Sequence, residues 1–159
     1  MIILGSTSEV AQAFVEKALT AGEKFPKIYL VTSSRETTER FAQHIDVKFL
    51  QPSEIIELDL TQEINYSVFE NIDSDLLFCA TGYLGLGAED GLYDDKNTEK
   101  IIDINYAKLV PVINYFAKKM ESFVKYFSVI FLIAICFGAL LKEREHLANY
   151  FSSVGLVCA

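Results

Sequence analysis

The chain has few of the residues that build metal-stabilised or disulfide-stabilised proteins. It contains three cysteines, two histidines, three prolines and no tryptophan. Cys79, Cys136 and Cys158 are widely spaced and odd in number, so they form no Cys-x-x-Cys motif and suggest no disulfide framework. His44 and His146 lie far apart and lack the spacing of metal ligands. We therefore expect no metal site.

Positive charge is also scarce. Lys and Arg total 14 against 22 Asp and Glu, which gives a net charge of -8. This balance argues against nucleic acid as a partner, because such binding needs a basic face. It does not exclude a nucleotide, since backbone N–H groups can hold a phosphate without net charge. The chain begins on an apolar run with no basic segment before it, so we expect no signal peptide and a cytoplasmic location.

What the sequence does contain is an alternation of two kinds of hydrophobic segment. Short apolar runs rich in β-forming residues alternate with segments whose apolar residues recur at helical spacing. Strands are predicted at Ile2–Leu4, Ile28–Thr32, Ile55–Leu60 and Leu76–Ala80, and helices at Val10–Leu19, Arg35–His44, Thr61–Asn71 and Asn97–Met120. This order predicts an α/β fold with a parallel sheet and right-handed crossovers.

The turn after the first predicted strand has the residues of a phosphate-binding loop. Such a loop needs a tight turn, a close backbone approach and a helix N-terminus directed at the charge. Gly5 can supply the turn, while Ser6, Thr7 and Ser8 offer hydroxyl donors and a helix N-cap. One glycine does not by itself distinguish this loop from an ordinary capped turn between a strand and a helix.

The segment Leu4–Ala11 resembles the Thr-Gly-x-x-x-Gly-x-Gly turn of the short-chain dehydrogenase/reductase family. It is more similar to a subgroup with Gly-Ala-Thr-Ser-Asp/Glu-Ile-Ala, which includes ketoreductases acting on lipid-linked sugars. Gly5 matches the first glycine, whereas Glu9 and Ala11 replace the second and third. The carboxylate of Glu9 would repel a pyrophosphate unless it pointed outward. By this resemblance, cofactor contacts are expected from Gly5, Ser6, Thr7, Ser8, Glu9 and Val10.

Three further segments resemble the same family in the same order. Asp59-Leu60-Thr61 resembles its Asp-hydrophobic-Thr turn, in which Asp59 would bind the adenine amino group. Cys79-Ala80-Thr81-Gly82 stands where the family has Asn-Asn-Ala-Gly. Asn105 is the counterpart of an asparagine that kinks the fourth helix and holds a water of the proton relay. The resemblance thus adds Leu60, Ala80, Thr81 and Gly82 to the expected cofactor contacts. It extends to about Met120, which implies a three-layer Rossmann-like fold that is incomplete relative to the family.

The end of the second predicted strand bears on the choice of cofactor. NAD-specific sites place an acidic residue there to bind the ribose 2′-hydroxyl. Here Ser33 and Ser34 take those positions, and Arg35 follows. A guanidinium can pair with the 2′-phosphate of NADP(H), so we expect NADP(H) in preference to NAD(H). The alternative is that Arg35 is a solvated residue at the start of a helix.

The catalytic residues of the family are missing at their expected place. Its chemistry uses Ser, Tyr and Lys, the last two spaced Tyr-x-x-x-Lys, and carbonyl reduction without them loses its general acid. Ile133-Ala134 stands where Ser-Ser is expected. Tyr115 and Lys119 have the Tyr-x-x-x-Lys spacing, but they precede the fifth strand candidate, Val129–Leu132. We interpret them as neighbours on a helix face.

The sequence divides into a Rossmann-like region, 1–125, and a divergent hydrophobic tail, 126–159. Within the tail, Tyr126–Leu141 is an uncharged run of 16 residues between Lys125 and Lys142, slightly shorter than a membrane-spanning helix requires. Three interpretations remain open: a buried fifth strand followed by a helix, a short membrane anchor, or the product of a shifted reading frame.

The resemblance implies an NADP(H)-dependent oxidoreductase that acts on a carbonyl or an alcohol, impaired by the missing Ser/Tyr/Lys set. The alternatives are a non-catalytic, truncated nucleotide-binding fragment and a membrane-anchored protein. The helix expected at 97–120 carries more apolar surface than one sheet face needs, which favours a homo-oligomer. The substrate cannot be read from the sequence.

Overall fold

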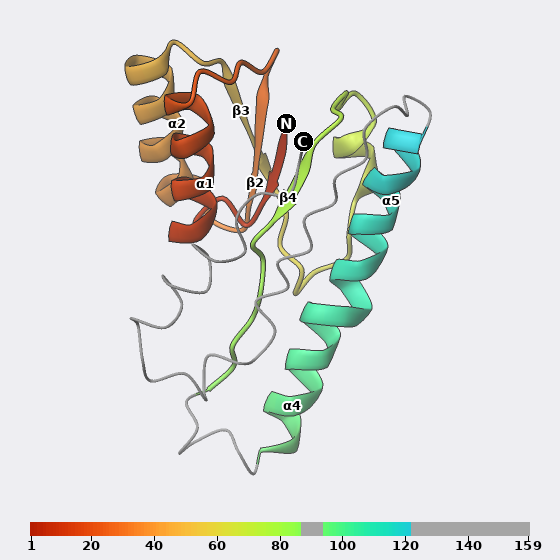
Figure 1. Cartoon of the computed structure of the whole chain (residues 1–159). Coiled ribbons are helices and arrows are strands. Elements are labelled where there is room, and N and C mark those ends of the chain that lie inside the picture. Colours follow the sequence, from red (N-terminus) through yellow and green to blue (C-terminus); the bar gives the residue numbers. More distant parts are fainter. Residues whose placement is uncertain (87–93, 122–159) are drawn as a thin grey trace, which may run out of the picture.

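A four-stranded parallel sheet organises the chain. The computed structural model describes residues 1–86 and 94–121 (Figure 1). The sheet has the order β3-β2-β1-β4. Its strands are β1 (Ile2–Leu4), β2 (Ile28–Thr32), β3 (Ser53–Glu57) and β4 (Leu77–Cys79). Every neighbouring pair is parallel, as the alternation of strand and helix predicts.

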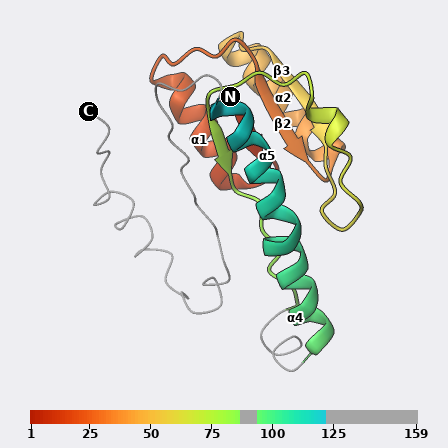
Figure 2. The ribbon, with the colours of Figure 1, turned by 90° about the vertical axis from the view of Figure 1, so that its right-hand side faces the viewer.

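Helices cover both faces of the sheet. One face carries α1 (Glu9–Thr20) and α2 (Arg35–Phe49). The other carries α5 (Leu109–Glu121), while α4 (Asp95–Ile102), which precedes it, extends beyond the sheet (Figures 1 and 2). The three-layer Rossmann-like arrangement is therefore confirmed, with four strands in the described part of the chain.

The alternating side chains of β1 supply both cores. Ile2 and Leu4 point to one face, and Ile3, between them, points to the other. All three are at most 1% exposed, as expected for a strand covered on both sides. On the Ile3 side, α1 contributes Ala11, Val15 and Leu19. On the other side, α5 contributes Val112, Ile113, Phe116 and Met120.

Two boundaries differ from the sequence prediction near the β3 edge. Helix α2 does not stop at His44 but continues to Phe49, and Leu50 ends it in the left-handed conformation with φ 52°. Strand β3 occupies Ser53–Glu57 instead of Ile55–Leu60. The reason is its pairing with β2, whose last register pair joins Thr32 to Glu57. The apolar run continues past the sheet because Leu60 is buried in the core beyond it.

The predicted helix at 97–120 is longer and is interrupted. It begins at Asp95, because Asp94 caps it by accepting hydrogen bonds from the Lys96 and Asn97 amides at 2.9 and 3.3 Å. A π-helical segment, Asp103–Lys108, separates α4 from α5. The predicted helix at 61–71 is reduced to a 3₁₀ turn, Tyr66–Phe69.

Within the described residues, no helix is long and apolar enough to cross a membrane. The apolar run 126–141, with its three interpretations, lies outside the described residues. The same holds for Ile133-Ala134.

Candidate functional site

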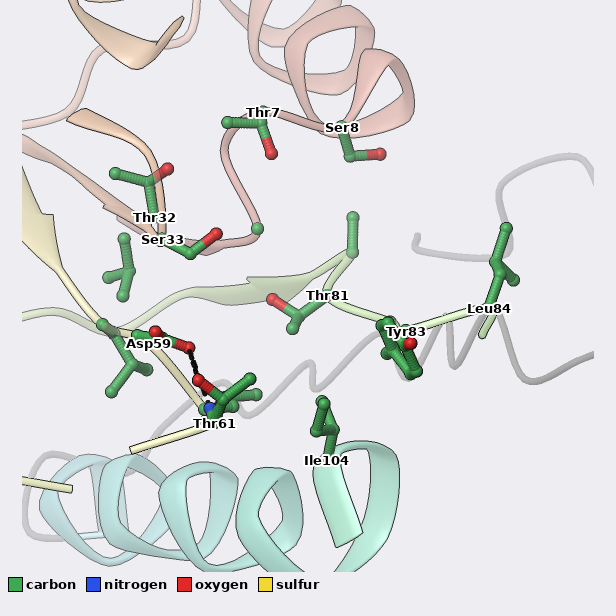
Figure 3. Close-up of a pocket in the computed structure, with 16 residues that line it drawn as sticks. Thr7, Ser8, Thr32, Ser33, Asp59, Thr61, Thr81, Tyr83, Leu84 and Ile104 are labelled. Atoms are coloured by element: carbon green, nitrogen blue, oxygen red, sulfur yellow. Dashed lines mark hydrogen bonds between the residues drawn. The ribbon is translucent and has the colours of Figure 1, made fainter. Parts of the chain in front are cut away.

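A cavity of about 430 Å³ lies at the carboxyl ends of the strands. Ligands of open α/β sheets bind at this edge, and the volume falls within the usual range of ligand sites. Figure 3 shows the side chains converging on the cavity from the ends of the four strands and the loops after them, and from the π-helical segment. The lining residues are Gly5, Thr7, Ser8, Val31, Thr32, Ser33, Leu58, Asp59, Leu60, Thr61, Ala80, Thr81, Gly82, Tyr83, Leu84 and Ile104.

Gly5, in the turn after β1, lies directly against the loop after β4. Its φ is +82°, a conformation that L side chains rarely adopt. A Cβ atom here would lie 2.7 Å from Thr81 Oγ1 and 2.8 Å from the Ala80 carbonyl carbon. Its amide donates to the Val31 carbonyl at 3.0 Å, which ties the turn to β2. This position therefore requires glycine for both its conformation and its space.

The three residues after Gly5 have different roles in the turn. Thr7 and Ser8 line the cavity (Figure 3). Ser8 is the N-cap residue of α1 by backbone conformation, although its side chain makes no capping hydrogen bond. Ser6 is fully buried instead, and its hydroxyl contacts the Val31 carbonyl and Thr38 Oγ1, both at 3.3 Å. Ser6 thus supports the turn from behind rather than facing the cavity.

Glu9 and Val10 are exposed and do not line the cavity. They belong to the first turn of α1, whose backbone N–H groups have no partner within the helix. Because these N–H groups and the helix dipole favour negative charge, the N-terminus of α1 can interact with an anion beside Thr7 and Ser8.

The residues after β2 divide between the cavity and its edge. Ser33 lines the cavity, whereas Ser34 and Arg35 do not. Ser34 caps α2 by backbone conformation, and its amide donates to Thr32 Oγ1 at 3.0 Å. The Arg35 guanidinium forms an ion pair with Glu57 through Nε, and its Nη2 donates to the Ile55 carbonyl at 3.4 Å.

Asp59 is the one charged residue that lines the cavity among those the structure describes. Its Oδ1 accepts hydrogen bonds from the amide and from the hydroxyl of Thr61, both at 2.8 Å (Figure 3). These bonds favour the charged form and lower the pKa of Asp59 below its usual value, the backbone bond contributing most. Leu60, between them, is buried and forms part of the cavity wall.

On the opposite side of the cavity, the loop after β4 is fixed by Asn105. The Asn105 amide accepts from the Tyr83 N–H at 2.6 Å and donates to the Tyr83 carbonyl at 2.8 Å. Asn105 itself does not line the cavity, but its neighbour Ile104 does. The Lys100 ammonium lies 4.8 Å from the centre of the Tyr83 ring, a distance typical of a cation–π contact.

Seven of the lining residues are not among the cofactor contacts expected from the sequence: Val31, Thr32, Leu58, Thr61, Tyr83, Leu84 and Ile104. Most of them end a strand or follow one directly. The rule that ligands lie at the carboxyl ends of parallel strands would have found them. Ile104 carries no such signal, because its place depends on how the π-helical segment crosses the cavity.

Tyr115 and Lys119 lie away from the cavity and have structural contacts. The Lys119 ammonium donates to the carbonyls of Phe69 and Glu70, both at 2.8 Å. The Tyr115 ring packs against the Tyr66 ring, with centroids 5.1 Å apart. These contacts agree with the interpretation of the pair as a helix face. Within residues 1–86 and 94–121, no group of three His, Cys, Asp or Glu could hold a metal ion.

Comparison with known proteins gives a fold but no family. The sequence matches no known family model and no curated protein. Its structure is similar to a solved structure of a 7β-hydroxysteroid dehydrogenase, with a TM-score of 0.59 and 18% sequence identity. The matched region covers 76% of this chain and 47% of that one, so the chain spans about half the length of the dehydrogenase. At this identity the similarity shows a shared Rossmann-like fold.

Proposed function

We propose that this chain is the dinucleotide-binding part of an oxidoreductase similar to the short-chain dehydrogenases, and that its cavity binds a nicotinamide adenine dinucleotide. The observation that carries the proposal is the lack of room for a side chain at Gly5. No side chain fits between the turn after β1 and Thr81, so the backbone borders the cavity directly, as close approach to a pyrophosphate requires.

The residues present fit such a cofactor. Thr7, Ser8 and the N-terminus of α1 would hold the pyrophosphate by hydrogen bonds and by the helix dipole. This matters because no Lys or Arg belongs to the cavity lining in the described residues. Asp59 would accept a hydrogen bond from the adenine amino group, since Thr61 binds only its Oδ1. The backbone of Thr81 and Gly82, after β4, would border the adenosine half.

The bound nicotinamide would supply the hydride chemistry with a carbonyl or alcohol substrate. The chain's own part is to bind and orient the cofactor. The lining contains no Tyr and Lys spaced Tyr-x-x-x-Lys in the described residues, and Lys119 is engaged at the 3₁₀ turn. We therefore propose cofactor binding with impaired turnover. A non-catalytic nucleotide-binding protein is the second candidate, and the contacts of Tyr115 and Lys119 favour it.

A titration of the purified full chain with NADPH and NADH tests the proposal by heat of binding and melting temperature. A ligand at 100 times its Kd adds about 2.7 kcal/mol of stability. Asp59→Ala is expected to weaken both ligands, while Lys17→Ala, remote from the cavity on α1, should leave binding unchanged. Absence of binding by both nucleotides would reject the proposal. If the nucleotides bind, an assay of NADPH oxidation with a panel of carbonyl compounds separates an oxidoreductase with impaired turnover from a non-catalytic nucleotide-binding protein.

The remaining expectations stay predictions of the sequence. NADP(H) is expected in preference to NAD(H), because no acidic residue ends β2 and Arg35 follows it. Homo-oligomerisation through residues 97–120 and a cytoplasmic location are further expectations. Light scattering at high protein concentration tests the homo-oligomerisation.

A further inference from the structure

An ion pair joins the end of β3 to the start of α2, close in sequence to residues that line the cavity. Glu57, the last residue of β3, is the register partner of Thr32, the last residue of β2. Its carboxylate pairs with the Arg35 guanidinium, which lies at the start of α2. Both side chains are accessible to solvent, with exposed fractions of 50% for Arg35 and 60% for Glu57.

Along the chain, Arg35 and Glu57 are two residues and one residue away from residues that line the cavity. Thr32, Ser33 and Leu58 all line the cavity, and the Leu58 amide donates to the Thr32 carbonyl at 2.7 Å. Glu57 directly precedes Leu58, and Arg35 follows two residues after Ser33. Both members of the ion pair are therefore within two residues, along the chain, of residues that a bound ribose would meet.

Arg35 is consequently not a free cation. A ribose 2′-phosphate would use the guanidinium through charge-assisted hydrogen bonds, but the Glu57 carboxylate already occupies Nε. Glu57 would also repel a doubly charged phosphate placed beside Arg35. Exposed ion pairs contribute little stability, so a phosphate can displace this carboxylate at small cost. Glu57 should thus reduce the preference for a 2′-phosphate without abolishing it.

We propose that Glu57 is a specificity-determining residue of this site. Its carboxylate reduces the preference of the site for adenosine that carries a 2′-phosphate over adenosine that does not. The proposal rests on the proposed function, in which the cavity binds an adenine dinucleotide. It assigns the choice of cofactor to the pair of Arg35 and Glu57 together and not to the residue after β2 alone.

The test uses two ligands that differ only in the 2′-phosphate, adenosine 5′-monophosphate and adenosine 2′,5′-bisphosphate. Calorimetric titration of the full chain gives the ratio of their affinities. Glu57→Gln keeps the shape of the side chain and removes its charge. It should raise the ratio in favour of the bisphosphate about fivefold to tenfold, and leave the monophosphate affinity within about twofold. Arg35→Gln should lower the ratio.

A second ion pair that also uses a glutamate of β3 provides the matched control. Lys27 and Glu54 pair at 3.0 Å near the amino ends of β2 and β3, with similar exposure. Glu54→Gln makes the same change of charge away from the cavity and should leave the ratio unchanged. In an Arg35→Gln background, Glu57→Gln should raise the ratio less than it does in the wild type.

The outcomes separate this proposal from the proposed function. If the wild type binds the monophosphate and Glu57→Gln leaves the ratio unchanged, the role of Glu57 is rejected while the nucleotide site stands. An equal rise in Glu54→Gln would show a general effect of charge and would also reject it. If the wild type binds neither ligand, the proposed function fails first. Circular dichroism of each variant verifies that it is folded.

Discussion

The side-chain amide of Asn105 exchanges two hydrogen bonds with the main chain of Tyr83, at 2.6 and 2.8 Å. The two residues are 22 positions apart, one in the π-helical segment Asp103–Lys108 and the other in the loop after β4. π-Helical turns occur often at functional sites, where the wider turn changes the direction of a side chain. Here the irregular turn and the cavity wall are joined through one amide.

Removal of this amide should loosen the cavity wall. Asn105→Ala leaves the N–H and C=O of Tyr83 without their partners, which is expected to lower the free energy of unfolding by about 1–3 kcal/mol. Urea denaturation measures the loss, and hydrogen exchange should increase for residues 81–86. Asn71→Ala, at an exposed position, is the control and should change stability by less than about 0.5 kcal/mol. Equal effects of the two substitutions would contradict this role of Asn105.

Two glycines separate backbone strain from lack of space. Gly5 and Gly22 both have positive φ, at +82° and +93°. A Cβ at Gly22 would meet nothing within 4 Å, whereas one at Gly5 would contact Thr81 and Ala80 at 2.7–2.8 Å. Gly22→Ala should therefore cost about 1 kcal/mol from conformation alone. Gly5→Ala should cost about 2–5 kcal/mol because it adds overlap with backbone atoms. Thermal denaturation of both variants measures the two losses of stability. Similar losses would argue against a close contact at Gly5.

The sequence predicted the sheet well where one strand is buried on both faces. The apolar runs Ile2–Leu4 and Ile28–Thr32 mark β1 and β2 to the residue, because a doubly covered strand is continuously apolar. β3 was placed wrongly because its pattern continues to the buried Leu60. Pairing with β2 ends the strand at Glu57, and no local pattern reveals the pairing partner of a strand.

The pKa of Asp59 should depend on the hydroxyl group of Thr61. The hydrogen bonds from Thr61 lower its pKa in the folded protein. A group with a lowered folded pKa stabilises the fold above its unfolded pKa, and this contribution is lost as the pH falls through the folded value. Thr61→Val removes the hydroxyl donor but keeps the backbone N–H, so the pKa of Asp59 should rise part of the way to its usual value. NMR titration of the Asp59 carboxyl group measures it. Thr7→Val, also in the cavity wall, should leave that pKa unchanged.

The sequence predicts those parts of the site in which the residue type determines the main-chain conformation. The positive φ of Gly5 is such a case. The roles of Ser6 and Arg35 depend on residues distant in sequence: Thr38 accepts or donates behind the turn, and Glu57 pairs with the guanidinium. Because these partners lie 32 and 22 positions away, local motifs place the side chains near the cavity but do not determine where they point.

Lys119 should matter for stability and not for nucleotide binding. Its ammonium donates to the Phe69 and Glu70 carbonyls at the end of the 3₁₀ turn, and it lies 5.9 Å from the centre of the Tyr115 ring. Lys119→Met keeps the aliphatic chain and removes both hydrogen bonds, so it should lower the free energy of unfolding by about 1–3 kcal/mol. Lys118→Met, at the exposed neighbouring position, should have almost no effect. If Lys119→Met instead preserved stability but abolished NADPH oxidation, the spacing of Tyr115 and Lys119 would have to be interpreted as catalytic, because a purely structural lysine cannot change turnover without changing the fold.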